Sequence, residues 1–130
     1  MFGRHRIAEL TGQLTVSRGE QERVQQTLDA IAAQIGYIEF SPSGIVESAN
    51  DILLSIVGYE RQEVIGKHHR SLCDSSYTAS SEYQRFWEDL GRGIKKQGTF
   101  PRFARDGRRV WLEATYFPVT NEDGKVFKVI

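Results

Sequence analysis

The sequence predicts an α+β domain preceded by a long amphipathic helix, and two features of the apolar pattern indicate this class. Residues 7 to 35 follow heptad spacing, whereas from Gly36 onward the apolar residues follow the shorter periods of strands and turns. Residues 36 to 130 then show the order strand, strand, several short helices, one longer helix and three strands. We therefore expect a helix at residues 1–35 and a folded domain at residues 36–130.

The leading helix is defined by a heptad seam. Its apolar positions are Ile7, Leu10, Leu14, Val24, Leu28, Ile31 and Ile35, and Ser17 and Gln21 fill the remaining positions. This pattern is typical of a helix that pairs with another helix. Gly12 and Gly19 each cost about 1 kcal/mol in a helix interior, so we expect the first half to fray or bend. Two interpretations remain open: the helix lies on the sheet of its own domain, or it forms a parallel dimeric coiled coil or a connector.

The domain is expected to begin with a hairpin and short helices. "YIEF" at 37–40 and "IVES" at 45–48 predict two strands, separated by the turn "SPSG". In "ANDILLSIVGY", Asn50 or Asp51 is suited to the N-cap of a short helix and Gly58 to its C-cap. "RQEVIG" predicts one further helical turn that ends at Gly66.

A longer helix and three strands complete the expected domain. Residues 78–96 carry Tyr83, Phe86, Trp87, Leu90 and Ile94 at helical spacing. "GTFPRFAR", "RRVWLEATYFPV" and "KVFKVI" predict strands joined by the turns "DG" and "NEDG". Trp111 alternates with Leu112 and so lies on the opposite face of its strand, but alternation alone leaves open which face is buried. Because no turn or polar tail follows "FKVI", we expect the natural chain to continue into a larger protein.

Composition excludes several classes of function. The 130 residues are 39% hydrophobic, which suits one core of ordinary size. Seventeen basic and 17 acidic residues give zero net charge, so nucleic acid is not an expected partner. A single cysteine makes no internal disulfide, and no signal peptide or long apolar span is present in this sequence. We expect a cytoplasmic module, either a free protein or the cytoplasmic part of a membrane-associated receptor.

The strongest local pattern is "ANDILLSIVGYERQEVIGKHH". The arrangement of Asn50, Gly58, Tyr59, Glu63 and Gly66 resembles the signature of PAS domains, and the resemblance extends over residues 36 to 130. "GKHHRSLCDSSYTASSEYQRFWEDLGRG" is most similar to the PAS modules of bacterial chemotaxis and aerotaxis transducers. The resemblance implies a five-stranded antiparallel sheet with short helices on one face and a ligand pocket between them.

The stretch "GKHHRSLCDSS" at 66–76 carries the side chains best suited to chemistry. A zinc site needs about four ligands, and His68, His69 and Cys73 supply at most three, so no metal site is expected unless His69 holds a haem. Covalent haem attachment requires a second cysteine. No oxyanion or substrate-binding signature accompanies Cys73, so we expect no enzymatic activity and interpret Cys73 as a small buried hydrophobe.

The resemblance carries expectations about a cofactor. Light-sensing PAS domains place a cysteine where this chain has His69, so a blue-light adduct is not expected. Aerotaxis modules hold FAD and read its redox state, and Asn50, His69 and Trp87 match positions of that group. Cys73 stands where that group has an arginine, for which Arg70 or Arg85 could substitute. Haem, with His68 or His69 as ligand, is the second candidate, and no cofactor or another small ligand is the third.

The candidate cofactor-binding residues are Asn50, His69, Arg70, Tyr83, Trp87 and Trp111. For His69, a structural role at a helix start competes with a ligand role. For the two tryptophans, packing in a core or interface competes with pocket lining.

The predicted function is that of a signal-sensing module of a chemotaxis or aerotaxis transducer that detects redox state or oxygen, with FAD favoured as cofactor. Its expected partners are a second copy, bound through the N-terminal helix and the flanks of the sheet, and a downstream signalling domain with its kinase complex. The alternative function is a cofactor-free module for dimerisation or protein interaction, or a sensor of another small ligand.

Overall fold

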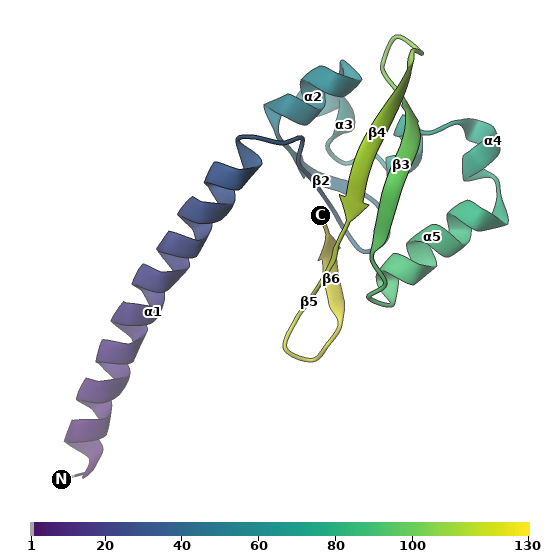
Figure 1. Cartoon of the computed structure of the whole chain (residues 1–130). Helices are drawn as coiled ribbons and strands as arrows, with labels where there is room; N and C mark the ends of the chain where they lie inside the picture. The colour runs from purple at the N-terminus through teal and green to yellow at the C-terminus, as the bar shows by residue number, and fades with distance from the viewer. Residues whose placement is uncertain (1) are drawn as a thin grey trace. The chain divides into compact units, whose positions relative to one another are not determined.

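A computed structural model describes residues 2–130, with side chains from Ser17 onward. The chain separates into two compact units, one that ends at Gln34 and one that spans Ile35–Ile130. We refer to the second as the folded unit. Figure 1 shows its sheet and short helices and, as a separate body, the long helix α1.

Helix α1 spans Phe2–Ala32 without interruption. The expected bend or fraying at Gly12 and Gly19 is therefore not seen. The seam side chains of Ile7, Leu10 and Leu14 lie outside the described side chains. The later seam positions are exposed in the single chain: Val24 by 59%, Leu28 by 53% and Ile31 by 54%.

No helix in the described part of the chain is both long enough and apolar enough to cross a membrane.

The folded unit begins with the expected hairpin. Strand β1 (Ile38–Phe40) pairs antiparallel with β2 (Val46–Ala49). The turn between them requires Gly44, whose φ is +94°, and a Cβ there would lie 2.7 Å from Nε2 of His68. The turn and the loop that carries His68 are thus packed directly against each other.

The helical segments follow in order: α2 (Asp51–Val57), α3 (Arg61–Val64), the 3₁₀ helix η1 (His69–Leu72), α4 (Ser75–Thr78) and α5 (Ser81–Gly91). Asn50 caps α2 at its start and Gly58, with φ of +73°, ends it, as the sequence predicts. The expected helix at 78–96 is shorter at both ends. The hydroxyl of Ser80 accepts a hydrogen bond from the backbone N–H of Tyr83, which sets the start of α5, and Gly91 is its last residue.

The later strands are β3 (Lys96–Phe103), β4 (Arg109–Tyr116), β5 (Pro118–Thr120) and β6 (Val126–Val129). The expected fourth strand is divided at Phe117, because its first part pairs with β3 and its second with β6. Phe117 itself exchanges two backbone hydrogen bonds with Ile130, of 2.7 and 2.9 Å. With this division, the expected antiparallel strands form a sheet of order β2-β1-β6-β5 and a ribbon of β3 and β4.

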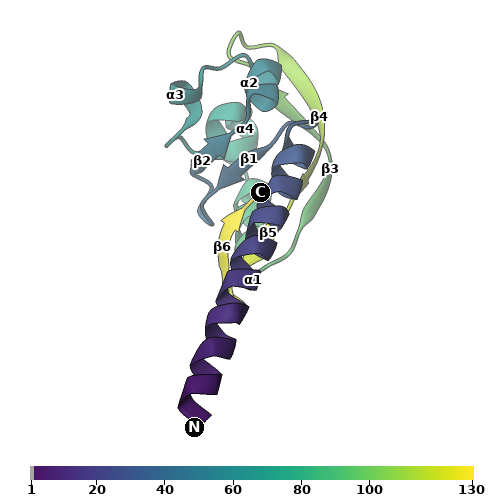
Figure 2. The ribbon, with the colours of Figure 1, turned by 90° about the vertical axis from the view of Figure 1, so that its left-hand side faces the viewer.

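The core of the folded unit lies between its strands and its short helices, and α2, α3 and α4 lie on one side of the β3–β4 ribbon (Figure 2). Leu90 of α5 and Val129 of β6 are both fully buried. On β4, Tyr116 is buried and Trp111 is 61% exposed, which answers the question that strand alternation left open. The face of β4 that carries Leu112, Ala114 and Tyr116 is the interior face.

Candidate functional site

His69 lies in the interior of the folded unit and is only 1% exposed. It is the first residue of η1, and its backbone N–H donates to the carbonyl of Gly44 at 2.8 Å. The side chain of His68 accepts a hydrogen bond from the backbone N–H of Arg70 and so caps η1. These local bonds fix the start of η1 and place the imidazole of His69 inside the folded unit.

Both ring nitrogens of His69 are hydrogen-bonded to tyrosines. Nδ1 lies 2.9 Å from the hydroxyl of Tyr83 on α5, and Nε2 lies 2.9 Å from the hydroxyl of Tyr116 on β4. The Tyr116 hydroxyl also accepts a hydrogen bond of 2.9 Å from Nη2 of Arg102 on β3. We call Tyr83, His69, Tyr116 and Arg102 the interior chain. It connects the long helix of the folded unit to the β3–β4 ribbon through consecutive hydrogen bonds.

The side chains that hydrogen-bond directly to His69 are two phenols and a thiol, which are neutral at pH 7, whereas Arg102, the next member of the interior chain, is charged. Burial, followed by the positive charges of Arg102 and His68, holds the pKa of His69 well below its usual value. Burial raises the pKa of Tyr83 and of Tyr116. It also raises the pKa of the Cys73 thiol, whose sulfur is 3.5 Å from Nδ1 of His69, to about 11. The guanidinium of Arg102 therefore carries the formal charge of the interior chain.

Aromatic rings surround the imidazole of His69. The ring centroids of Phe40, Phe86 and Trp87 lie 5.4, 6.0 and 5.3 Å from that of His69. Phe86 is stacked on the imidazole, whereas Phe40 and Trp87 meet it edge to face. Such a shell excludes water and strengthens the hydrogen bonds inside it.

Two buried side-chain donors in the described part of the chain lack a hydrogen-bond partner, and both belong to this region. They are Nε of Arg102 and Nε1 of Trp87. The indole of Trp87 is near enough to the Tyr83 hydroxyl to oppose the rise of its pKa, but its N–H does not meet the geometry of a hydrogen bond. Because buried donors are normally satisfied, these two N–H groups mark the places in the described interior where an acceptor atom is expected.

The structure brings together three of the candidate cofactor-binding residues, His69, Tyr83 and Trp87, whose role in binding stays a prediction. Arg70 is exposed, and Trp111 is exposed on the outer face of β4. These two side chains lie outside the interior chain and its aromatic shell. The buried position of Cys73 agrees with its interpretation as a small buried hydrophobe.

Asn50 has a structural position. Its Oδ1 accepts hydrogen bonds of 3.0 Å from the backbone N–H groups of Leu53 and Tyr37. Its Nδ2 donates to the carbonyl of Ile35 at 2.7 Å. The side chain thus ties the start of α2 to the segment that leads into β1.

Sequence reasoning did not identify Tyr116 and Arg102. Alternation along "RRVWLEATYFPV" placed Tyr116 on the same face as Leu112, but no motif connected it with His69. Arg102 lies two residues after Phe100 on β3, so both side chains lie on the face of β3 that is turned inward. An arginine in phase with the apolar face of a strand was the available signal.

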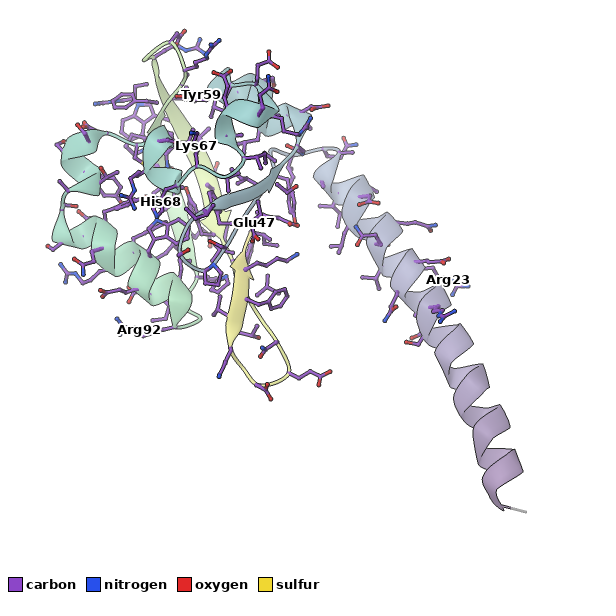
Figure 3. All side chains as sticks on the ribbon, turned by 180° about the vertical axis from the view of Figure 1, so that it is seen from behind. Arg23, Glu47, Tyr59, Lys67, His68 and Arg92 are labelled. Carbon is purple, nitrogen blue, oxygen red and sulfur yellow. The ribbon has the colours of Figure 1, made fainter. Side chains whose placement is uncertain are left out.

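His68 (labelled in Figure 3) lies between η1 and the β1–β2 turn. Its Nε2 is 2.8 Å from the carbonyl of Ser43, and its Nδ1 accepts from the backbone of Arg70. Burial lowers the pKa of His68, and the charge of Arg70 lowers it further. Neither histidine of the folded unit therefore presents a ring nitrogen without a partner. The described residues include no cluster of histidine, cysteine and acidic side chains suited to a metal ion.

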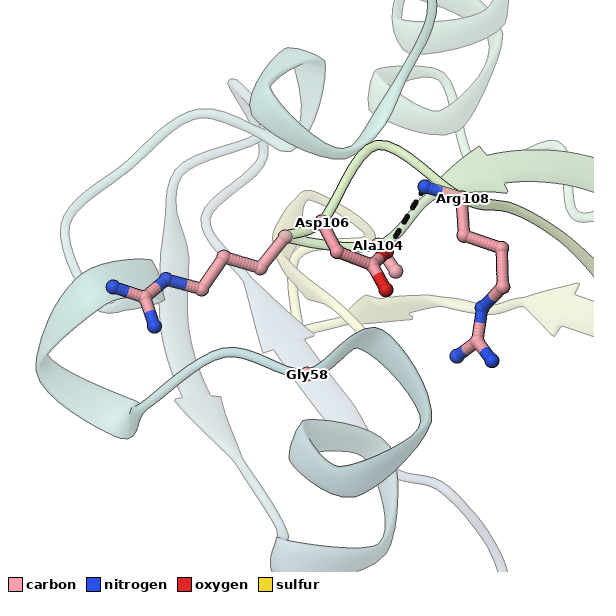
Figure 4. A pocket seen from close by; sticks show the side chains of 5 residues that line it. Gly58, Ala104, Asp106 and Arg108 are labelled. Carbon is pink, nitrogen blue, oxygen red and sulfur yellow. Dashed lines mark hydrogen bonds between the residues drawn. The ribbon is translucent and has the colours of Figure 1, made fainter.

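A separate pocket opens at the surface, at the turn between β3 and β4. It has a volume of about 390 Å³ and is lined by Gly58, Ala104, Arg105, Asp106 and Arg108. The Asp106 side chain accepts a hydrogen bond of 2.9 Å from the backbone N–H of Arg108 (Figure 4). None of these lining residues belongs to the interior chain. A second surface pocket of about 400 Å³ lies along α2 and α3.

An antiparallel sheet with short helices on one face, enclosing polar groups in an aromatic interior, defines a class of small sensory module. The PAS domain family matches residues 35–130, and the chain belongs to that family. It is 45% identical over 101 residues to the biofilm dispersion protein BdlA of Pseudomonas aeruginosa, covering 78% of this chain and 24% of that protein. The chain thus spans about a quarter of this relative's length.

Solved structures show the same fold. An RNA-binding light-oxygen-voltage receptor superposes with a TM-score of 0.69 at 22% identity, covering 84% of this chain and 32% of that one. The PAS domain of a protein from Colwellia psychrerythraea superposes with a TM-score of 0.68 at 14% identity, covering 82% and 91% of the two chains. The family match and the similarity to BdlA together identify the chain as a PAS sensory module related to BdlA, and PAS sensor domains are in general signalling modules that catalyse no reaction.

Proposed function

We propose that this PAS module senses redox state or oxygen through a ligand held beside the interior chain, as part of a chemotaxis or aerotaxis transducer in the cytoplasm. The observation that carries the proposal is the position of His69, a buried neutral imidazole hydrogen-bonded to α5 on one side and to β4 on the other. A change at this residue acts on both layers of the fold.

The residues of the interior suit a flavin better than a haem. The orphan donors of Arg102 and Trp87 match the acceptor-rich ring and phosphate of FAD, and the aromatic shell offers rings for stacking. Haem ligation by His69 requires the loss of its bond to Tyr83 or Tyr116, because both nitrogens are engaged. FAD is therefore the first candidate and haem the second. A bound flavin supplies a change of charge and protonation on reduction.

The interior chain converts such a change into a change between helix and sheet. A neutral imidazole has one N–H, so His69 donates to one tyrosine and accepts from the other. Moving its proton from one nitrogen to the other reverses both hydrogen bonds at once. To move the equilibrium between two arrangements of helix and sheet from 1:9 to 9:1, a ligand state must favour one arrangement by about 2.6 kcal/mol. This is on the order of one or two charge-assisted hydrogen bonds.

The output is proposed to pass through α1 to a downstream signalling domain and its kinase complex, within a homodimer. The exposed seam positions Val24, Leu28 and Ile31 give α1 an apolar stripe that a second copy can cover, together with the flanks of the sheet. The same exposed stripe, with Trp111 on the outer face of β4, favours the second candidate function. This is a cofactor-free module for dimerisation or protein interaction.

The absorbance spectrum of the purified protein separates these functions. Flavin bands or a Soret band support the sensor, and their absence from a folded protein supports the interaction module. If a cofactor is bound, His69→Ala is expected to lower its occupancy, whereas Cys73→Ser leaves it unchanged. Unchanged occupancy in His69→Ala would remove His69 from the site. Asn50→Ala removes the cap of α2, so a loss of occupancy in that variant is attributed to the site only if the free energy of unfolding is unchanged.

A second experiment addresses signalling. The module is fused to its signalling domain, and output is recorded under reducing and oxidising conditions. We expect the two outputs to differ, and His69→Gln to lock one of them. Equal outputs with a cofactor bound would contradict the redox sensor.

A further inference from the structure

We infer that the interior ligand carries an anionic group, a carboxylate or a phosphate, that pairs with the guanidinium of Arg102. The inference rests on the proposed function, because it concerns the ligand of that same interior. It names the chemical class of the ligand and the side chain that selects it.

The first argument is the charge of Arg102. This residue is only 3% exposed, and the ion pairs found among the described residues do not include it. Among the groups whose pKa is clearly shifted, its charge acts on His69, Cys73, Tyr77, Tyr83 and Tyr116, and none of these is an acid that carries a negative charge at pH 7. A buried charge is normally paired, because its transfer from water is costly. The charge of Arg102 thus has no counter-charge among the described residues.

The second argument is the unused hydrogen-bonding capacity of the guanidinium. A guanidinium has five N–H groups in a planar fork that matches carboxylate and phosphate oxygens. In Arg102, Nη1 donates to the carbonyl of Pro101 at 2.8 Å and Nη2 donates to Tyr116, whereas Nε has no partner. Phe100 and Tyr116 cover the guanidinium with their rings, at 5.0 and 5.9 Å from Cζ to the ring centroids. A neutral ligand would leave this charged fork uncompensated.

The surface arginines of the folded unit differ in this respect. Arg61 pairs with Asp51, Arg92 with Glu88, and Arg105 with Glu63. All three side chains are more than half exposed, so water also solvates them. Arg102 has the opposite environment, which is why we assign the anion to it and not to Arg70 or Arg85 on the exposed surface.

An anion at Arg102 also has a route to the output. Arg102 donates to Tyr116, Tyr116 bonds to His69, and His69 bonds to Tyr83 on α5. Pairing with an anion offsets the positive charge of Arg102 that otherwise acts on the Tyr116 hydroxyl and on the imidazole of His69. Binding at one end of the interior chain therefore changes the hydrogen bonds at its other end.

The test uses two pairs of probes that differ in the anionic group. FMN is compared with riboflavin, and haemin with haemin dimethyl ester, by fluorescence or absorbance titration of the apoprotein. We expect the anionic member of a bound pair to bind about 10- to 100-fold more tightly than the neutral member. Arg102→Met should abolish this preference, whereas Arg70→Met and Arg85→Met should retain it. The pair that shows the effect tells phosphate from carboxylate.

Two results would overturn the inference while leaving the proposed function intact. One is equal binding of the anionic and neutral members by the wild type. The other is a preference that survives in a folded Arg102→Met variant. If neither pair binds, the flavin and haem forms of the proposed function fail. The inference is then tested by comparing the thermal unfolding midpoints of the wild type and Arg102→Met.

The stability measurement needs no ligand. Removal of an uncompensated buried charge should leave the unfolding midpoint of the ligand-free protein unchanged or higher in Arg102→Met than in the wild type. A clearly lower midpoint would show that Arg102 is a structural element of the fold, and the inference would be wrong. Arg102→Lys keeps the charge without the planar fork and should bind FMN or haemin more weakly than the wild type does.

Discussion

The buried imidazole of His69 predicts that acid destabilises the folded unit in a specific pH window. Its pKa in the folded protein lies well below its usual value because of burial and the charges of Arg102 and His68. In the unfolded chain a histidine titrates near pH 6.5. As the pH falls below about 6.5, the unfolded chain takes up a proton that the folded protein excludes, so the free energy of unfolding decreases. This contribution to stability is fully present above the unfolded-state pKa and is lost on acidification.

The magnitude follows from the linkage relation. A histidine that stays neutral in the folded state lowers the free energy of unfolding by about 2 kcal/mol between about pH 7.5 and pH 5. The groups that face His69 are Tyr83 on α5, Tyr116 on β4, Arg102 on β3 and Cys73 beside η1. The phenols and the thiol have raised pKa values, and they do not titrate in this window.

Urea denaturation at a series of pH values measures the effect, with His69→Gln as the matched variant. Glutamine keeps a donor and an acceptor but does not titrate, so the variant should lack the His69 contribution whatever its absolute stability. His68 also has a lowered pKa and accounts for part of any slope that remains. If the wild type and His69→Gln show the same pH dependence from about pH 7.5 to pH 5, His69 is not excluded from protonation, and the reasoning is refuted.

Three further predictions concern packing, capping and assembly. Leu90→Ala should lower the free energy of unfolding in urea denaturation by about 2 to 5 kcal/mol, because the side chain is fully buried. Ile94→Ala, at an exposed position, should change it little. A small effect at Leu90 would contradict the packing. Asn50→Ala should lower the free energy of unfolding by about 2 kcal/mol in the same assay, because α2 loses its cap. Asn50→Asp should lower it less, because aspartate keeps the oxygen that accepts the capping hydrogen bond. Equal losses in the two variants would argue against the cap. Joint replacement of Leu28 and Ile31 by lysine should convert a dimer to a monomer in sedimentation, and a monomeric wild type would disprove the seam interface.

The local features of the fold were predictable because they depend on neighbours in the chain. The Asn50 cap and the Gly58 terminus of α2 lie within nine residues of each other, and side-chain capping and positive φ are short-range effects. The β1–β2 turn follows from Pro42 and Gly44 in the same way. The end of α5 was misplaced because apolar spacing continued to Ile94, while the Ser80 cap and the glycines at 91 and 93 set the actual bounds.

The sequence by itself determined the class of fold and the order of its elements, because these depend on periodicity, caps and turns read over short stretches. His69 was named as a candidate from the resemblance to aerotaxis PAS modules. The tertiary structure alone decided that Tyr116, 47 residues further along the chain, bonds to the same imidazole as Tyr83. It also decided that Arg102 is buried and Trp111 exposed, although both lie on strands with alternating apolar residues. Alternation divides a strand into two faces, but which face is covered depends on where the helices pack. The interior chain exists because that packing brings η1, α5, β3 and β4 together.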